Sequence, residues 1–226
     1  MTEVNVVRVF TDPQGNHGNA LGVVLDTAGL DDDRRQAIAT ELNYSETVFV
    51  DDITEARLRI YTPAREIPLA GHPLVGTSWL LAQVTGRPIE TLRPLRAANA
   101  DTWVMDGVTW IRARIADAPP WQFVQVETPA EVEALSVPPG PEYDLHDFWA
   151  WQDEAEGRIR ARVFAASHNI AEDEATGSGA LRLIEVLGRE LLITQGRGSL
   201  IYARPAKQQG RGEVGGRVVS EGTRDV

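Results

Sequence analysis

Two segments of the sequence place side chains that can do chemistry directly before an apolar run. Residues 68–85, PLAGHPLVGTSWLLAQVT, put His72 behind a glycine, and residues 175–188, ATGSGALRLIEVLG, put Ser178 between two glycines. Asp173 stands five residues before Ser178. An imidazole, a hydroxyl and a carboxyl can bind polar substrates and transfer protons. The two segments are therefore candidates for parts of one site.

Both segments predict a buried helix, one near residues 73–85 and the other near 178–188. Pro73 suits the first helical position, where its missing N–H needs no partner. Gly71 allows other groups to approach the backbone closely. A helix N-terminus carries free N–H groups and about half a positive charge, which favours a bound carboxylate or phosphate. We expect the two helix ends, at Gly71 and Gly177, to face each other across a cleft.

Each candidate residue also has an ordinary structural explanation. A single histidine such as His72 more often serves as a structural hydrogen-bonding residue. Asp173 can be an ordinary acid near a helix start, and Ser178 can cap the helix. Glu46, at the start of an expected strand, is most simply explained as a solvent-facing glutamate when it is taken alone. Taken together, however, the two similar helix starts and their polar side chains predict a polar site of carboxylate size.

Several familiar catalytic motifs are excluded. A nucleophile elbow needs glycines where Thr176 and Ala180 stand, and a dinucleotide-binding loop needs a small residue at Arg182. The sequence has no P-loop, and no two of its four histidines have metal-ligand spacing. It has no cysteine, which excludes a thiolate nucleophile. Its single lysine, Lys207, lies in a Gly- and Gln-rich segment and is a poor Schiff-base candidate.

Composition predicts a globular chain, because 42% of the 226 residues are hydrophobic and the length suffices for one large domain or two smaller ones. The formal net charge of −11 argues against a nucleic-acid-binding surface. No apolar run is long enough to cross a membrane, and the first ten residues lack signal-peptide features. We therefore expect a cytoplasmic protein without nucleic-acid or membrane partners.

The order of the expected elements suggests two strand-rich halves, each built around one buried helix. Residues 93–101 have no clear periodicity and are expected to be a linker. The N-terminal half is assigned to residues 1–98 and the C-terminal half to 99–210, with 211–226 as a last strand and tail that return to the N-terminal half. In residues 158–164, arginines alternate with apolar residues, which predicts a strand with one solvent-exposed face.

Four segments, in this order and spacing, resemble the phenazine-biosynthesis isomerase family of PhzF-like proteins. They are FTDPQGNHGNALGVVLD (10–26), LNYSETVFV (42–50), RIYTPAREIPLAGHPLVGTSWLL (59–81) and EDEATGSGA (172–180). The resemblance implies an α+β fold of the diaminopimelate-epimerase-like type. Such a fold has two pseudo-symmetric halves, each a mostly antiparallel sheet wrapped around a central helix, with the active site between them.

The resemblance also implies roles for the candidate residues. The glutamate of Ser-Glu-Thr, here Glu46, is expected to be the general acid/base, while His72, Asp173 and Ser178 hold and polarise the substrate. Four backbone N–H groups are expected to bind the substrate carboxylate: those of Gly71, His72, Gly177 and Ser178. The family's reference reaction is a proton shift within a small cyclic diene acid, without cofactor or metal. The family is commonly homodimeric, so we expect a homodimer here.

The sequence departs from the family pattern at several positions. Glu174 follows Asp173 where proline is usual, Gly179 replaces an alanine, and Leu74 replaces a threonine. The chain is also short between Asp101 and Arg158. These differences bear on the identity of the substrate more than on the fold.

Three functional hypotheses follow. The first is an isomerase that moves a proton through Glu46 within a small carboxylated substrate, with a cyclic diene or an amino acid as candidates. The second is a non-catalytic binder of small carboxylic acids with the same fold. The third, a serine hydrolase using Ser178, His72 and Asp173, is weakened by the missing elbow pattern.

Overall fold

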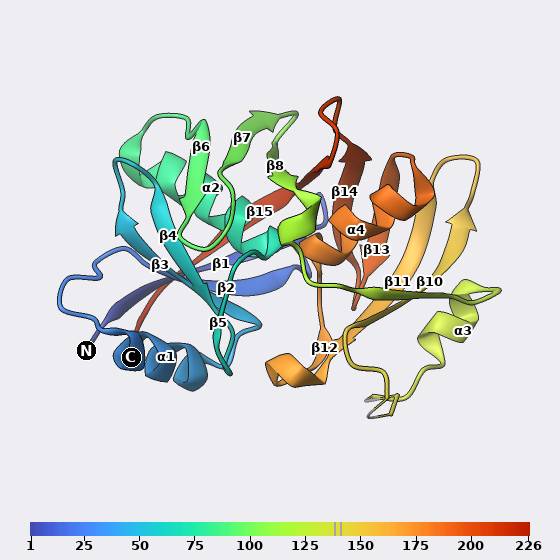
Figure 1. Ribbon diagram of the computed structural model, residues 1–226, viewed down its shortest axis with the longest axis horizontal. Coiled ribbons are helices and arrows are strands. Elements are labelled where there is room, and N and C mark those ends of the chain that lie inside the picture. Colours follow the sequence, from blue (N-terminus) through green and yellow to red (C-terminus); the bar gives the residue numbers. More distant parts are fainter. Residues whose placement is uncertain (138, 141) are drawn as a thin grey trace.

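Two halves, each with a helix at its centre, lie side by side in the computed structural model (Figure 1). The structure describes residues 1–137, 139–140 and 142–226. The central helices are α2 (Gly71–Thr85) and α4 (Gly177–Leu187). Each ends at a glycine with positive φ, Gly86 (68°) or Gly188 (66°), which is the common way to close a helix C-terminus.

The strands around α2 form a closed circuit. Their bounds are β1 (Glu3–Thr11), β2 (Asn19–Val24), β3 (Glu46–Asp52), β4 (Arg57–Tyr61), β6 (Thr91–Pro94), β7 (Ala100–Met105), β8 (Val108–Arg114) and β15 (Arg211–Asp225). These strands are hydrogen-bonded in the order given, and β15 pairs with β1 again. The helix contacts strands on several sides of the circuit, so that ten of its residues are buried.

The strands of the other half continue from β15 in the order β14-β13-β11-β10-β9, and α4 packs on β14 and β15. Their bounds are β9 (Gln122–Gln125), β10 (His146–Asp153), β11 (Arg158–Ala165), β13 (Leu191–Gln195) and β14 (Ser199–Pro205). The remaining elements are β5 (Glu66–Ile67), β12 (Ile170–Asp173), α1 (Asp32–Leu42), α3 (Pro129–Glu133) and the 3-10 helices η1 (Ile115–Asp117) and η2 (Ala166–His168).

The order of the elements repeats between the halves. β2-α1-β3-β4-β5-α2-β6 corresponds to β9-α3-β10-β11-β12-α4-β13. In both halves, parallel neighbours are connected through a helix: β2/β3 through α1, β4/β6 through β5 and α2, β9/β10 through α3, and β11/β13 through β12 and α4. The other strand pairs are antiparallel. The expected α+β fold with two pseudo-symmetric, mostly antiparallel halves is therefore confirmed.

The long strand β15 joins the halves. Its residues 212–215 pair with β14, its residues 211–216 pair with β8, and its residues 217–225 pair with β1. The expected linker at residues 93–101 is shorter than predicted, because β6 and β7 pair with each other and leave only residues 95–99 between them. The assignment of the halves to residues 1–98, 99–210 and 211–226 stays a prediction.

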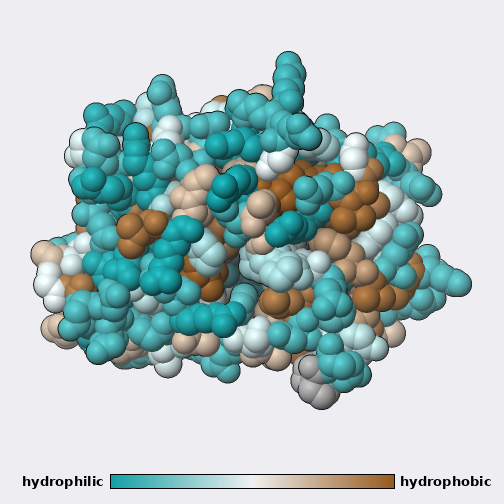
Figure 2. Space-filling model, viewed as in Figure 1, coloured by the Kyte–Doolittle hydropathy of each residue, from teal (hydrophilic) through white to brown (hydrophobic). Residues whose placement is uncertain are grey.

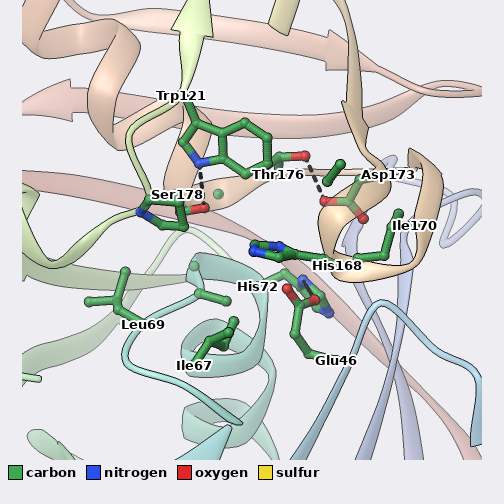
Figure 3. A pocket seen from close by; sticks show the side chains of 15 residues that line it. Glu46, Ile67, Leu69, His72, Trp121, His168, Ile170, Asp173, Thr176 and Ser178 are labelled. Carbon is green, nitrogen blue, oxygen red and sulfur yellow. Dashed lines mark hydrogen bonds and ion pairs between the residues drawn. The ribbon is translucent and has the colours of Figure 1, made fainter. Parts of the chain in front are cut away.

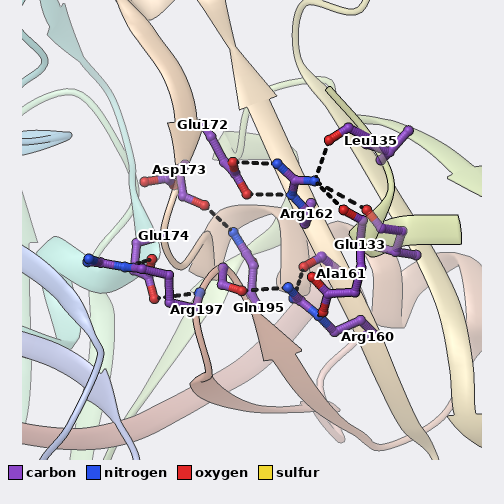
Figure 4. Close-up of polar contacts among 12 residues, drawn as sticks. Glu133, Leu135, Arg160, Ala161, Arg162, Glu172, Asp173, Glu174, Gln195 and Arg197 are labelled. Carbon is purple, nitrogen blue, oxygen red and sulfur yellow. Dashed lines mark hydrogen bonds and ion pairs between the residues drawn. The ribbon is translucent and has the colours of Figure 1, made fainter. Parts of the chain in front are cut away.

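The solvent-exposed face expected for residues 158–164 is wrong. Arg160 and Arg162 of β11 are only 6% and 7% exposed. Arg162 donates to both carboxylate oxygens of Glu172, at 2.7 and 2.8 Å, and to the carbonyl of Leu135 at 2.7 Å (Figure 4). Arginine can be buried when its donors are satisfied in this way, and α3 with the chain after it covers this face of the strand.

The surface in the view of Figure 1 is mostly hydrophilic, with hydrophobic residues gathered over the half that contains α4 (Figure 2). Within the described ranges, no helix has the length and the apolar character needed to span a membrane.

The buried arginine of β11 gives a test of the fold. Arg162→Ala removes the donors to Glu172 and to the Leu135 carbonyl. We expect the free energy of unfolding to fall by about 3 kcal/mol, because breaking a buried ion pair leaves its partner uncompensated. Arg158→Ala, at the exposed end of the same strand, should change it by less than about 0.5 kcal/mol. Denaturant titration measures both values, and equal small losses would contradict the structural importance of Arg162.

Candidate active site

The N-termini of the two central helices contact each other through glycines. A Cβ atom added to Gly71 would lie 2.6 Å from the backbone of Gly177, and one added to Gly177 would lie 2.9 Å from Cα of Gly71. Any larger residue at either position would force the helices apart. The two sets of free N–H groups therefore open onto the same place, as the sequence predicted for helix ends that face each other.

Glu46 and His72 form the first pair of polar groups at this place. Glu46 is the first residue of β3 and His72 the second residue of α2, and they are only 7% and 2% exposed. Nδ1 of His72 lies 3.2 Å from Oε2 of Glu46. Among the described residues, neither Oε2 of Glu46 nor Nε2 of His72 has a hydrogen-bond partner. Glu46 is thus a buried carboxyl rather than a solvent-facing strand end.

Burial sets the protonation of this pair. It raises the pKa of Glu46 well above the usual range of a glutamate, and the nearby charge of Asp173 raises it further. Burial lowers the pKa of His72 to about 3, against a hydrogen bond to the Ala20 backbone that raises it. The imidazole is therefore neutral at pH 7, and Glu46 keeps its proton to a higher pH than an exposed glutamate does.

Asp173, the last residue of β12, is held by three donors. Its Oδ1 accepts from Nδ2 of Asn19 at 2.7 Å and from Oγ of Ser45 at 2.8 Å, and its Oδ2 accepts from Oγ1 of Thr176 at 2.6 Å. Burial raises the pKa of Asp173, whereas these three hydrogen bonds lower it. Asn19 and Ser45 belong to the N-terminal half, so the carboxylate also ties the two halves together.

Ser178, the second residue of α4, is paired with a residue that the sequence did not indicate. Its Oγ accepts a hydrogen bond from the indole Nε1–H of Trp121 at 3.0 Å (Figure 3). Trp121 lies between η1 and β9 and is 9% exposed. Its spacing from Ser178 follows no motif, and a buried tryptophan in a proline-containing loop gives no signal of such a contact.

These groups line one pocket between the helix ends (Figure 3). The pocket is lined by Glu46, Ile67, Leu69, Ala70, Gly71, His72, Pro119, Trp121, Ala165, His168, Ile170, Asp173, Thr176, Gly177 and Ser178. All six site residues expected from the sequence are among them. The set contains no arginine or lysine, so the positive ends of the helices are the cationic feature of the wall. The free volume is about 10 Å³, which holds roughly one water molecule.

His168 is a second pocket residue that sequence reasoning missed. It belongs to η2, is 5% exposed, and points its ring into the pocket (Figure 3). Burial lowers its pKa, and the nearby charge of Arg65 lowers it further, so the ring is neutral at pH 7. The fold brings His168 and His72 together although they are far apart in sequence.

The departures from the family pattern lie outside the pocket wall. Leu74 is fully buried in the main hydrophobic core. The carboxylate of Glu174 accepts hydrogen bonds from the Arg197 backbone N–H at 3.0 Å and from Oγ of Ser199 at 2.7 Å. It is therefore directed at these two residues and does not line the pocket. A Cβ atom at Gly179 would lie at ordinary contact distance, 3.5 Å, from Oδ2 of Asp147.

Asp147 corresponds to Glu46 in the other half. Both strands have an irregularity just before an aspartate, Asp52 in β3 and Asp153 in β10, and Glu46 and Asp147 each stand six residues before it. Asp147 is 3% exposed, and its Oδ1 has no hydrogen-bond partner among the described residues. Burial raises the pKa of Asp147 to about 7. Asp147 does not line the pocket.

The described part of the chain contains no group of three or more His, Asp or Glu side chains that could hold a metal ion.

Solved structures of other proteins share this fold. A PhzF-family phenazine biosynthesis protein from Bacillus anthracis superimposes with a TM-score of 0.80 at 20% identity, over all of this chain and 98% of that one. A probable proline racemase from Agrobacterium radiobacter superimposes with a TM-score of 0.63 at 11% identity, over all of this chain and 93% of that one. The diaminopimelate-epimerase-like fold implied by the sequence is therefore confirmed.

Sequence comparison identifies the family. A family profile described as phenazine biosynthesis-like protein matches residues 7–95. The chain is 30% identical to the trans-2,3-dihydro-3-hydroxyanthranilate isomerase of Pseudomonas aeruginosa, over 90% of this chain and 88% of that protein. It is 32% identical to the isomerase of the same name from Pseudomonas chlororaphis, over 91% and 92%. The chain therefore belongs to the PhzF-like family and is an isomerase of that family.

The raised pKa of Asp147, the counterpart of Glu46 in the other half, can be tested through the pH dependence of stability. Because the folded-state pKa of Asp147 is raised to about 7, the folded state holds a proton that the unfolded chain releases near pH 4. Stability should fall as pH rises from about 4 to about 7, and Asp147→Asn removes this loss. At pH 8 the variant should be more stable than the wild type by a few kcal/mol, since one pKa unit is about 1.4 kcal/mol.

Thermal unfolding of both proteins between pH 4 and pH 8 measures this difference. Asp153→Asn, at the exposed end of the same strand, is the control for the loss of a surface charge. A stability difference between Asp147→Asn and wild type that does not change with pH would contradict the raised pKa.

Proposed function

We propose that this chain is a cofactor-independent isomerase that shifts a proton within a small carboxylated substrate, with Glu46 as the single acid/base. The observation that carries the proposal is the carboxyl of Glu46, which is buried, faces the pocket, has an unpartnered oxygen and has a raised pKa. A general acid/base acts best when its pKa lies near the working pH.

The reaction is balanced with one carboxyl. Ionised Glu46 takes a proton from an sp³ carbon, and the electron pair of the broken C–H bond moves into the adjoining double bonds. The carboxylic acid then returns the same proton to a carbon at the other end of the conjugated system. When Glu46 starts in its protonated form, the two steps occur in the opposite order. No proton or electron is gained or lost overall.

The substrate carboxylate is proposed to lie between the helix ends. The backbone N–H groups of Gly71, His72, Gly177 and Ser178 are its expected donors, and two helix dipoles favour its charge. This choice is supported by the pocket wall, which has no arginine or lysine that would otherwise bind an anion. Neutral His72 is proposed to hold Glu46 and the substrate in place, and Asp173 to bind a polar substituent of the substrate.

The substrate class follows from the relatives and from the wall. The Pseudomonas enzymes are named for an amino- and hydroxy-substituted cyclic carboxylic acid. We propose a substrate of the same kind, because Ile67 and Leu69 offer apolar contacts to a ring. A ring exceeds the present free volume of about 10 Å³, so lining side chains must move when it binds. The expected homodimer and cytoplasmic location remain predictions.

Glu46→Gln tests the acid/base role. The amide keeps the size of the side chain but cannot exchange a proton, so turnover should fall by at least about 100-fold. Binding of 3-hydroxyanthranilate, a stable aromatic relative of the proposed substrate, should change little. Proton exchange is followed by NMR in deuterated buffer with trans-2,3-dihydro-3-hydroxyanthranilate and other small cyclic and amino carboxylic acids, and binding by calorimetry.

The control is Glu41→Gln, an exposed glutamate of α1 outside the pocket, which should behave as wild type. Retained exchange in Glu46→Gln would exclude Glu46 as the acid/base. Binding without exchange in the wild-type protein would favour the non-catalytic carboxylate binder instead.

Ser178→Ala separates the isomerase from a serine hydrolase. For the isomerase, the loss of one hydrogen bond to the substrate should weaken binding of 3-hydroxyanthranilate by about 2- to 10-fold and leave measurable proton exchange. For a hydrolase, the loss of the nucleophile should abolish all turnover. Calorimetry and the NMR exchange assay give the two values, and complete loss of exchange would contradict the proposed role of Ser178.

A further inference from the structure

The hydrogen bond between Trp121 and Ser178 restricts what the serine can do. An indole N–H can only donate, whereas a hydroxyl can both donate and accept. Oγ of Ser178 must therefore be the acceptor in the 3.0 Å contact. Its own proton then points away from the indole, and among the described residues this is the only hydrogen bond of the Ser178 side chain. The hydroxyl proton is left for a group inside the pocket.

Trp121 is held firmly enough to impose this orientation. Its ring packs in a small hydrophobic cluster with Val163, Ala165 and Ile170. The loop before it is attached to α4 itself, because Arg182 donates to the carbonyl of Ala118 at 2.7 Å and to that of Pro119 at 3.3 Å. Trp121 and the loop before it are thus attached to α4 at two places, Ser178 and Arg182.

Among the described residues, no pocket acceptor is hydrogen-bonded to the hydroxyl proton of Ser178. Asp173 already accepts from Asn19, Ser45 and Thr176. Glu46 lies in the other half, beside His72. The pocket wall at the start of α4 therefore offers only donors, namely backbone N–H groups and the Ser178 hydroxyl. A wall of donors suits a ligand that brings acceptors, as a carboxylate does.

We propose that Trp121 is a positioning residue that commits the Ser178 hydroxyl to donate to the carboxylate of the substrate. The proposal rests on the proposed function, in which the carboxylate lies at the helix ends. It also disfavours Ser178 as a base, because the indole engages one of the two lone pairs of its oxygen.

A double-mutant cycle of Trp121→Phe and Ser178→Ala tests this role. Phenylalanine keeps a ring against Val163, Ala165 and Ile170 but removes the N–H. Trp121→Phe should weaken binding of 3-hydroxyanthranilate by about 2- to 10-fold, the effect of one hydrogen bond. In the Ser178→Ala background the same substitution should have no further effect, because the hydroxyl that it orients is gone.

A second readout does not depend on ligand or turnover. The Trp121 indole N–H signal in a ¹⁵N–¹H spectrum is identified by its absence in Trp121→Phe, among the signals of the six tryptophans. It should move in Ser178→Ala, because its acceptor is lost. Trp103→Phe is the matched control, since Trp103 stacks on Trp110 outside the pocket and should leave both binding and this signal unchanged. Should Trp121→Phe not fold, one of the six indole signals should still differ between wild type and Ser178→Ala, and no difference in any of them would overturn the bond.

The possible outcomes separate this proposal from the proposed function. An unmoved indole signal, or binding losses that add fully in the double mutant, would overturn the role of Trp121 even if Glu46→Gln abolishes exchange. Coupled binding losses with exchange retained in Glu46→Gln would support Trp121 and exclude Glu46 as the acid/base. Failure of the wild-type protein to bind 3-hydroxyanthranilate would overturn both the carboxylate site and the role of Trp121 in it.

Discussion

The contact between the N-termini of α2 and α4 is the constraint on which the rest of the site depends. Each helix end carries about half a positive charge, so bringing the two together is electrostatically unfavourable. The contact requires Gly71 and Gly177, because a Cβ atom on either would collide with the backbone of the other helix. An ionised Asp173 nearby reduces the repulsion, and an anionic ligand would reduce it further. The proposed anion binding would thus be a consequence of how the two halves are joined.

The two pocket carboxyls differ because their surroundings differ. Asp173 accepts three hydrogen bonds, which favour its ionised form and oppose the effect of burial. Glu46 has an unpartnered oxygen and faces the charge of Asp173, and both conditions favour its protonated form. One carboxylate is thereby fixed as an anchor while the other can exchange its proton. The pKa of both carboxyls is raised by burial, and the three hydrogen bonds limit this rise at Asp173.

The sequence predicted those parts of the structure that depend on local patterns. The glycine-flanked starts of the two helices, the longer strands and the gathering of Glu46, His72, Asp173 and Ser178 in one pocket were all expected. The partners of these residues were not. Asn19 and Ser45 donate to Asp173 although they are 154 and 128 residues away from it in sequence. The periodicity of a sequence does not predict contacts between such distant residues. The alternation around Arg160 and Arg162 gave a wrong exposed face for the same reason, because their partners are distant in sequence.

The structure also indicates where members of this fold can differ in substrate. Asp173 is held by contacts between the halves, which leave little freedom to change. Trp121, His168 and Ile170 instead come from two connections of the C-terminal half, the loop after η1 and the segment from η2 to β12. They line the pocket without belonging to either helix end. Glu174 and Leu74, two departures from the family pattern, lie outside the pocket: Glu174 accepts a hydrogen bond from Arg197, and Leu74 packs in the main hydrophobic core. Differences in substrate should therefore be sought in these two connections rather than at the residues next to the motifs.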